Sequence, residues 1–366
     1  MYLKRISLTN FKNIAEARIE FSGGVNCING DNGQGKTNLL DAIYYLSMTK
    51  SYFDTADRFT FRHGEQTASV QGTYQTAEGT EETVTVILDK QSEKQVRRGK
   101  KQYSRFSDHI GLIPIVMSSP TDTALVNDAA AERRRFINIF LSQTDKAYLR
   151  NLQDYNQLLA QRNKLLKLDN VPSDLLEVFS SKMTPLADYV FRQRASLCER
   201  LIPLVGEYHR MLSGGREQVG LEYVSDLQDG PLDSLLAKDA ERERVLKHTT
   251  AGIHHDDLLL TLDGHQLRKC GSQGQQKSFL IALKLAQFTI MKESYNFPPI
   301  LLLDDVFDKL DSERVGHLMA IVSGNGFGQI FVTDSNKVRL GRIMEELTAE
   351  CAMFDVKEGQ FTRTES

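Results

Sequence analysis

The sequence predicts an α/β protein that combines a parallel sheet, an antiparallel β subdomain and an inserted α-helical arm. Three observations lead to this prediction. Apolar residues alternate with polar ones near the N-terminus, up to a glycine-rich loop at residues 30–35. A helical spacing of apolar residues runs through residues 131–212. Continuous apolar runs, ILLL and IFVT, then appear near the C-terminus, as is typical of parallel strands buried on both faces.

The N-terminal part is predicted to consist mainly of strands. Alternation over residues 3–8 and 17–21 predicts a pair of strands, and VNCIN at 25–29 predicts a short buried strand. Residues 68–116 are rich in β-forming residues, with turn signals in AEG and RRGKK. The glycine loop therefore lies between a strand and the predicted helix 38–47.

The middle of the chain is predicted to form two antiparallel helices. Apolar residues recur at spacings of three, four and seven from Leu152 to Leu166, and a second stripe begins at Leu176. The turn LDNVPSD separates them, and Gly214-Gly215 ends the second helix. Helices of about 35 residues would give an arm about 50 Å long. We expect residues 1–125 and 255–366 to form one discontinuous domain and residues 126–254 to form the insert.

Composition limits the function classes. The chain has 366 residues, a net charge of −3 and four scattered cysteines, which we expect to be free thiols in a cytoplasmic protein. It contains no run of about 18 apolar residues and no secretory signal, so we expect no membrane partner. The net charge does not indicate nucleic-acid binding, which would have to use local basic patches.

The loop GDNGQGKTN has the pattern of a phosphate-binding loop. Gly30, Gly35, Lys36 and Thr37 match G-x-x-x-x-G-K-[ST] between a strand and a helix. Glycines allow backbone N–H groups to converge on phosphate oxygens, and the helix N-terminus favours negative charge. We expect ATP here, with Lys36 at the terminal phosphates and Thr37 on Mg²⁺. The predicted nucleotide-binding residues are Gly30, Asp31, Asn32, Gly33, Gln34, Gly35, Lys36, Thr37 and Asn38.

The strand LLLDD is predicted to supply acidic residues for the same site. Asp304 would help to hold Mg²⁺, and Asp305 would polarise the attacking water. The predicted catalytic residues are therefore Lys36, Asp304 and Asp305. The alternative is an acidic pair that merely ends a strand.

A second anion-binding device is predicted at the start of a helix, in GSQGQQKS. Ser272, Gly274, Gln275 and Gln276 offer a hydroxyl, a glycine N–H and polar side chains at a positive helix end. Two such devices for one nucleotide suggest a head-to-tail homodimer that ATP holds together. The alternative is a polar loop that only caps a helix.

Together these motifs resemble ABC-type ATPases with a split head, namely the SMC proteins and, over nearly the whole chain, the RecF family. NFKNI is similar to the family's N-terminal motif, and GDNGQGKTN looks like its Walker A loop. GSQGQQKS looks like the signature, and LLLDDVFDKLD looks like Walker B with the D-loop, which adds Asp311 to the nucleotide-binding residues. The resemblance implies an ABC-ATPase-like head with the inserted helical arm.

The chain departs from the family pattern at several positions. Asn138 stands where Asp is usual, His255 where Arg is usual, and Lys277 where Arg is common. Thr333-Asp334-Ser335 stand where many ABC ATPases have a histidine, and no clear Q-loop glutamine lies near residues 117–120.

The resemblance implies a function in recombinational DNA repair. RecF proteins bind duplex DNA and single-stranded gap junctions as ATP-bound dimers and hydrolyse ATP slowly. They act with RecR, together with RecO, to load RecA onto gaps. Two other classes stay open: the soluble ATPase subunit of a membrane transporter, and a scaffold that uses ATP only for assembly.

Two basic clusters are candidate DNA contacts, because clustered Lys and Arg neutralise phosphates without reading sequence. The alternative for each is a solvated surface. The first cluster lies in a predicted hairpin and the second on the helical arm. The candidates are Arg97, Arg98, Lys100, Lys101 and Arg105 in the hairpin and Arg150, Arg162, Lys164 and Lys167 on the arm. We expect Arg133–Arg135 and the run His254–Asp257 to have structural roles.

Overall fold

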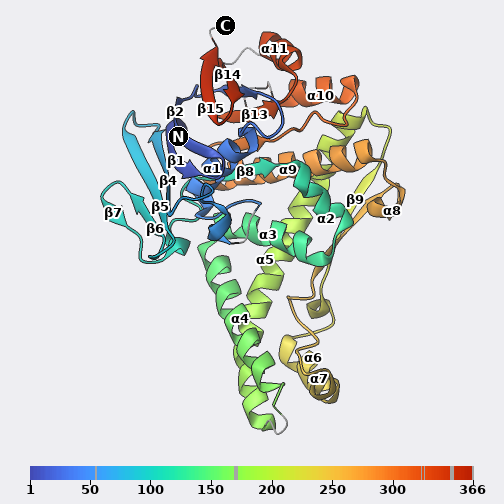
Figure 1. Ribbon diagram of the computed structural model, residues 1–366. Helices are drawn as coiled ribbons and strands as arrows, with labels where there is room; N and C mark the ends of the chain where they lie inside the picture. The colour runs from blue at the N-terminus through green and yellow to red at the C-terminus, as the bar shows by residue number, and fades with distance from the viewer. Residues whose placement is uncertain (54–55, 169–171, 323, 325, 347–349, 365–366) are drawn as a thin grey trace. The chain divides into compact units, whose positions relative to one another are not determined.

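The computed structural model describes residues 1–366 except 54–55, 169–171, 323, 325, 347–349 and 365–366. The chain forms two compact units, which we call the head unit and the arm unit. The head unit comprises residues 1–122, 211–214 and 273–366, and the arm unit comprises residues 123–210 and 215–272. Figure 1 shows the elements of both units, which are described separately below.

A mainly parallel sheet forms the centre of the head unit. Its order is β15-β14-β3-β13-β12-β8, and only β15 runs antiparallel to its neighbour. The sheet combines strands from both ends of the chain, which confirms the predicted single sheet. The strands are β3 (Val25–Asn29), β8 (Ile115–Ser118), β12 (Ile300–Leu303), β13 (Ile330–Asp334), β14 (Cys351–Lys357) and β15 (Gln360–Thr364). The unit's helices are α1 (Lys36–Met48), α9 (Gln273–Tyr295), α10 (Ser312–Val322) and α11 (Lys337–Glu346).

An antiparallel sheet of order β2-β1-β4-β5-β6-β7 forms the predicted β subdomain. Gly79 and Gly99 have positive φ in the turns that the AEG and RRGKK signals predicted. A glycine suits these turns because left-handed backbone has no Cβ penalty there. The strands are β1 (Tyr2–Phe11), β2 (Ile14–Glu20), β4 (Thr67–Gln75), β5 (Glu81–Asp89), β6 (Gln95–Arg98) and β7 (Lys101–Gln102), and the unit's 3-10 helices are η1 (Asp57–Phe59) and η2 (Phe106–Asp108).

The core of the head unit surrounds α1 and α9. Every residue of α1 from Leu39 to Met48 is buried, and most of α9 from Ser278 to Met291 is buried as well. Helices that are apolar on all sides belong in the interior of a protein. These two buried helices therefore carry the segments at their N-termini, the glycine loop before α1 and the GSQGQQKS motif at α9, on a rigid support.

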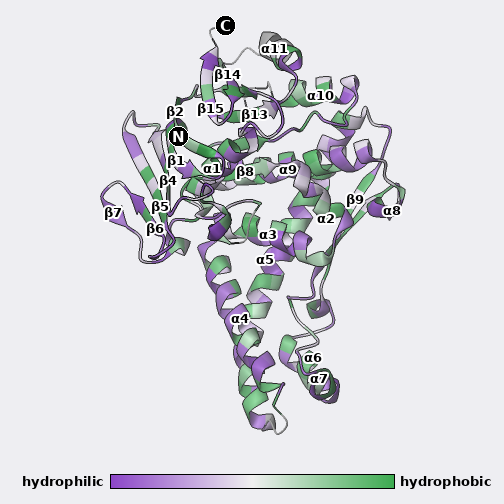
Figure 2. Cartoon of the chain, viewed as in Figure 1, coloured by the Kyte–Doolittle hydropathy of each residue, from purple (hydrophilic) through white to green (hydrophobic). Residues whose placement is uncertain are grey.

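Four helices make up most of the arm unit: α2 (Ala124–Asn127), α3 (Ala130–Thr144), α4 (Lys146–Leu165) and α5 (Ser173–Ser213). The sequence predicted one helix where α3 and α4 lie, and this was wrong. The side chain of Asp145 accepts hydrogen bonds from the N–H groups of Ala147 and Tyr148, so it starts a new helix. Figure 2 shows the hydrophobic and hydrophilic alternation along α4 that suggested an amphipathic helix.

The arm unit also contains a small sheet that the sequence analysis missed. Strand β10 (Asp257–Leu262) pairs with β9 (Val219–Val224) and with β11 (His265–Gln266). The unit boundaries therefore fall at 122/123 and 272/273, whereas the predicted insert spans 126–254. The short helix η3 (Pro120–Thr123) spans the boundary at 122/123. The remaining short helices of the arm unit are η4 (Asp226–Gln228), α6 (Leu232–Lys238), α7 (Ala240–Leu246) and α8 (Leu267–Cys270).

Buried ion pairs fill the interior of the arm unit. Arg133 binds both carboxylate oxygens of Asp257 at 2.6 and 3.0 Å, and Arg194 pairs with buried Asp256. Arg134 donates to the main-chain oxygen of Asp256 at 2.8 Å. Arg133 of the arginine run and the acidic pair after His255 are thus engaged in ion pairs within the arm unit, in agreement with the structural roles expected for them.

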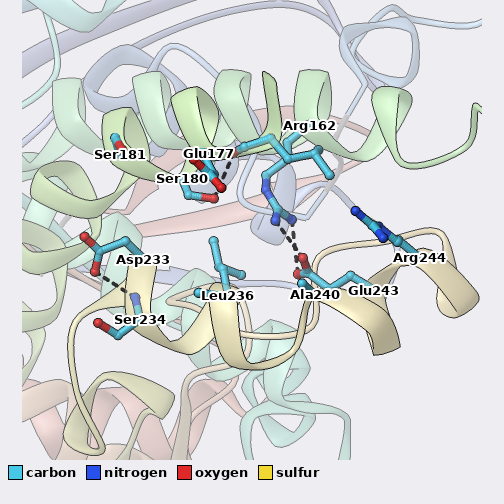
Figure 3. A pocket seen from close by; sticks show the side chains of 12 residues that line it. Arg162, Glu177, Ser180, Ser181, Asp233, Ser234, Leu236, Ala240, Glu243 and Arg244 are labelled. Carbon is cyan, nitrogen blue, oxygen red and sulfur yellow. Dashed lines mark hydrogen bonds and ion pairs between the residues drawn. The ribbon is translucent and has the colours of Figure 1, made fainter. Parts of the chain in front are cut away.

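Arg162 was predicted to contact DNA, and the structure contradicts this. Its side chain is buried, and its guanidinium pairs with Glu243 of α7 at 2.6 Å and donates to the hydroxyl of Thr249 at 2.8 Å. Figure 3 shows Arg162 and Glu243 pointing toward each other beside a cavity of about 490 Å³. A guanidinium whose charge is already neutralised in the interior is not available to a phosphate.

Replacing Arg162 with Met should destabilise the protein by about 3–5 kcal/mol, because the buried carboxylate of Glu243 loses its partner. Urea unfolding of the full chain measures the loss. Lys164→Met, an exposed position of the same helix, should change stability by less than about 0.5 kcal/mol. Equal stability of the two variants, with weaker DNA binding for Arg162→Met, would restore the DNA-contact hypothesis.

Candidate nucleotide-binding site

The glycine loop leads from β3 into α1 with the backbone geometry of a phosphate-binding loop. Gly33 and Gly35 have φ values of 80° and 116°, and α1 begins at Lys36. A Cβ atom added at Gly30 would lie 2.6 Å from the main-chain oxygen of Val356. Glycine is thus required at position 30 because a Cβ atom would clash with the neighbouring backbone, and at position 35 because the backbone has a positive φ.

Two neighbouring turns hold the loop in place, and the sequence analysis gave neither of them a role. The side-chain amide of Asn13 donates to the main-chain oxygen of Gly33 at 3.1 Å and its oxygen accepts from Asn38 at 2.7 Å. The N–H of Gly359, in the β14–β15 turn, donates to the main-chain oxygen of Gln34 at 2.9 Å. The signal for Asn13 was present in NFKNI, but its partners lie 20 and 25 residues away.

The ammonium group of Lys36 lies within the loop. It donates to the main-chain oxygens of Gly30 at 2.6 Å and Asp31 at 3.2 Å, and the residue is only 4% exposed. Asp31, Asn32 and Gly33 form the exposed crest of the loop. The loop therefore holds one cation at its base beneath an exposed, glycine-rich crest, as is typical of loops that bind phosphates.

Asp304 and Thr37 meet beside the loop. The hydroxyl of Thr37 lies 3.1 and 3.0 Å from the two carboxylate oxygens of Asp304. Burial raises the pKa of Asp304 to about 6, while hydrogen bonds from Thr333 and Thr37 oppose the shift. A hydroxyl and a carboxylate side by side form a hard oxygen donor set of the kind that Mg²⁺ prefers.

Asp305 follows at the end of the strand in a strained conformation. Its φ is 43°, a region that non-glycine residues seldom adopt, and its N–H donates to the hydroxyl of Thr333 at 2.9 Å. Burial raises the pKa of Asp305, and the charge of Lys36 opposes the rise. A carboxylate with a raised pKa is a better proton acceptor near neutral pH.

Thr333 is a site residue whose function the sequence did not reveal. Its hydroxyl donates to a carboxylate oxygen of Asp304 at 2.8 Å and accepts from the N–H of Asp305. The next residue, Asp334, forms an ion pair with Arg339 of α11 at 2.6 Å. The sequence showed only that a histidine was missing at this position; the structure shows that Thr333 connects both acidic residues.

The GSQGQQKS motif lies where the sequence predicted it, at the start of α9. Ser272 precedes the helix, and Gly274, Gln275 and Gln276 form its first turn. Near it, Asp311 caps α10, because its carboxylate accepts from the N–H of Arg314 at 2.8 Å. The structure thus brings Lys36, Thr37, Asp304 and Asp305 together in one chain.

The segment after β8, where no Q-loop glutamine was found, carries a buried acidic residue instead. Asp122 accepts hydrogen bonds from Tyr52 and from the N–H of Ser119, and it pairs with Lys284 of α9 at 3.2 Å. Tyr52 in turn donates its N–H to Asp41 of α1 at 2.7 Å. This network connects the helix after the glycine loop with the helix that carries GSQGQQKS.

The two basic clusters differ in how much of them is accessible. The predicted hairpin is confirmed as β6–β7, and its lysines Lys100 and Lys101 are exposed together with Arg97 and Arg105. Arg98 is half-buried and pairs with Glu82 at 2.6 Å. On the arm, Arg150, Lys164 and Lys167 are exposed.

No helix within the described part of the chain is long and apolar enough to cross a membrane.

Comparison with known proteins identifies the family. The profile of the RecF/RecN/SMC N-terminal domain matches residues 2–353. A protein of Parabacteroides distasonis named DNA replication and repair protein RecF is 44% identical over 360 residues, which is 98% of each chain. A protein of Bacteroides fragilis with the same name is 42% identical over 366 residues, covering 100% of this chain and 99% of the relative.

Solved structures agree with this assignment. The structure described as the recombination mediator protein RecF-ATP in the RecFOR pathway matches with a TM-score of 0.88 at 27% identity, covering 100% and 98% of the two chains. An Smc head domain of Pyrococcus furiosus matches with a TM-score of 0.59 at 15% identity, covering 99% and 96%, which shows a shared fold. The chain therefore belongs to the RecF family of DNA replication and repair proteins.

Proposed function

We propose that the protein binds and hydrolyses ATP and that ATP drives two copies together, head to tail, on duplex DNA and at single-stranded gaps. The observation that carries the proposal is the contact of Thr37 with Asp304 beside the glycine loop. It joins the two motifs that a P-loop ATPase needs, although they lie 267 residues apart. The relative described as RecF-ATP supports ATP as the nucleotide.

The residues present suit ATP with Mg²⁺. The loop N–H groups and Lys36 would hold the phosphates, and Thr37 and Asp304 would hold the ion. Bound Mg²⁺ would supply charge stabilisation to the phosphates. The site offers one carboxylate and one hydroxyl, which is typical for Mg²⁺ that is bound jointly by protein and phosphates.

Asp305 is the residue that we assign to the attacking water. It lies next to Asp304, and its backbone is fixed by Thr333. In this assignment the carboxylate orients the water and accepts its proton, while Lys36 stabilises the charge that develops on the terminal phosphate. We expect slow, DNA-dependent turnover, because the geometry is completed only when a second copy is present.

The second copy would contribute Ser272, Gly274, Gln275 and Gln276. The start of α9 is a positive helix end with a hydroxyl before it, and this arrangement suits a terminal phosphate. A C2 pair forms two equivalent sites, each with a glycine loop from one copy and a GSQGQQKS motif from the other. Asp311 of the partner subunit would lie near the same nucleotide, as the resemblance of its segment to the family's D-loop implies.

The proposed place of action is the cytoplasm, and the proposed partners are duplex and gapped DNA and RecR, together with RecO and, indirectly, RecA. The relative's description as a recombination mediator of the RecFOR pathway supports these partners. The exposed lysines and arginines of the β6–β7 hairpin and of α4 are the proposed phosphate contacts.

Ser272→Arg tests the head-to-tail dimer. The bulky cation should prevent the second copy from closing, while the glycine loop keeps its affinity for ATP within about twofold. Light scattering with a nonhydrolysable ATP analogue measures the dimer, and Ser92→Arg, which adds the same charge at an exposed position, serves as control. A Ser272→Arg variant that still dimerises with the analogue contradicts the split site.

Asp305→Asn separates an ATPase from an assembly scaffold. The amide cannot accept the proton, so we expect turnover to fall by a factor of about 10² or more, while ATP-dependent dimerisation persists. Phosphate release in the presence of gapped DNA measures the rate. If the variant hydrolyses ATP as fast as the parent chain, Asp305 is not the proton acceptor.

Replacing Lys100 and Lys101 with Glu tests the hairpin as a DNA contact. Loss of two phosphate contacts should reduce the slope of log K against log salt by about 2 and weaken binding to all sequences alike. Fluorescence anisotropy at several salt concentrations measures both effects. A control that replaces Lys238 and Lys357 with Glu carries the same charge change. Equal slopes for the two double variants would remove the hairpin from the DNA surface.

A further inference from the structure

Lys277 connects the first turn of α9 with the loop that carries Asp305. Its ammonium group donates to the main-chain oxygen of Asp305 at 2.8 Å and to that of Asp308 at 2.7 Å. An ammonium group has three donors and no acceptor, so one lysine can hold two carbonyl oxygens at once. Lys277 lies three positions after Gly274, so the contact with the Asp305 loop starts from the GSQGQQKS motif itself.

The loop after β12 needs such support, because its backbone is strained and its own hydrogen bonds are long. Asp305 and Lys309 have φ values of 43° and 63° without being glycine. The internal bonds, from Asp308 N–H to Asp305 oxygen and from Leu310 N–H to Phe307 oxygen, measure 3.4 and 3.3 Å. The two bonds from Lys277 are shorter than either of these.

A second set of contacts attaches the same helical turn to the far end of the loop. Arg314 donates to the hydroxyl of Ser278 at 2.6 Å, and this hydroxyl donates to the main-chain oxygen of Gly274 at 2.9 Å. A Cβ atom added at Gly274 would lie 3.4 Å from the main-chain oxygen of Lys309. The first turn of α9 and the loop 305–311 thus pack as one unit.

The ammonium group of Lys277 is partly buried beside two acidic residues. Burial lowers its pKa, and the carboxylates of Asp308 and Asp305 oppose the change. Asp308 is exposed, whereas Asp305 lies partly inside the site. The ammonium therefore interacts with the backbone of the loop through hydrogen bonds and with its two acidic residues through charge.

We infer that Lys277 is a positioning residue for ATP hydrolysis: it holds the backbone of Asp305, and through it the carboxylate, from the helix that meets the partner's nucleotide. The inference rests on the proposed split site. In that arrangement the first turn of α9 touches one nucleotide while Lys277 holds the catalytic loop at the other. A shift of this turn on dimer closure would move the main-chain oxygen of Asp305 with it. Each site would then respond to occupancy of the other.

Three variants test the inference: Lys277→Met, Lys277→Arg and the control Lys292→Met. Lys292 is in the same helix and donates to a main-chain oxygen too, that of Gly326 at 2.7 Å. We expect Lys277→Met to lower kcat at least about tenfold with KM and the analogue-driven dimer within about twofold of the parent. Lys277→Arg should recover most of kcat, because guanidinium also donates to two oxygens. Lys292→Met should keep the parental kcat.

The outcomes are distinct. A parent chain that neither dimerises nor hydrolyses ATP refutes the proposed function, whereas a normal parent with an equally fast Lys277→Met variant refutes only the inference. Loss of the dimer in Lys277→Met, or equal losses of kcat in Lys277→Met and Lys292→Met, would also overturn it, because either result indicates a structural role. If Lys277→Met does not fold, kcat and the dimer are measured for Lys277→Gln, whose amide keeps one donor group, and the same criterion applies.

Discussion

The hydroxyl of Thr333 is the contact on which the site geometry depends. Strand β13 lies between β3 and β12 in the sheet, so the glycine loop and Asp304 emerge on either side of it. The register places Leu303 opposite Val332 and Asn29 opposite Asp334, which aligns the carboxyl ends of three parallel strands. Ligands of open α/β sheets bind at such an edge. Thr333 of β13 then binds both Asp304 and Asp305, which follow the neighbouring strand β12.

The sequence was sufficient to predict those parts of the site whose residues lie close together along the chain. The glycine loop, the buried strand before Asp304 and the start of α9 each have a pattern within ten residues, and the structure places all three as predicted. Residues that act through distant partners were not predictable in this way. Asn13 was visible only as part of the NFKNI motif, whose role was unknown. Thr333 was noticed only because a histidine is absent from this position. Their partners are fixed only by the register of the sheet and by the turns beside it.

Most errors in the arm unit have the same origin. Arg162 lies two residues from exposed Lys164, and nothing in the helical spacing indicated that Glu243, 81 positions later, would pair with it. The cap at Asp145 lies within residues 131–212, where the helical spacing of apolar residues suggested one continuous helix up to the LDNVPSD turn. Strand β9 has only six residues, and its partner β10 lies more than 30 residues further on. For Arg162 and for β9 a tertiary contact decided what local propensity left open, whereas the cap at Asp145 is a local signal that the sequence analysis overlooked.

Buried charge pairs set the limits of movement in this protein. Arg194 with Asp256 and Arg162 with Glu243 each cost desolvation energy and are stable only with both partners in place. They therefore resist rearrangement inside the arm unit. The loop after β12 is different: its strained residues are held by hydrogen bonds that Lys277 donates to main-chain oxygens and by the N–H of Asp305, which donates to the hydroxyl of Thr333. We therefore expect the loop that carries Asp305 to rearrange more readily than the buried ion pairs of the arm unit.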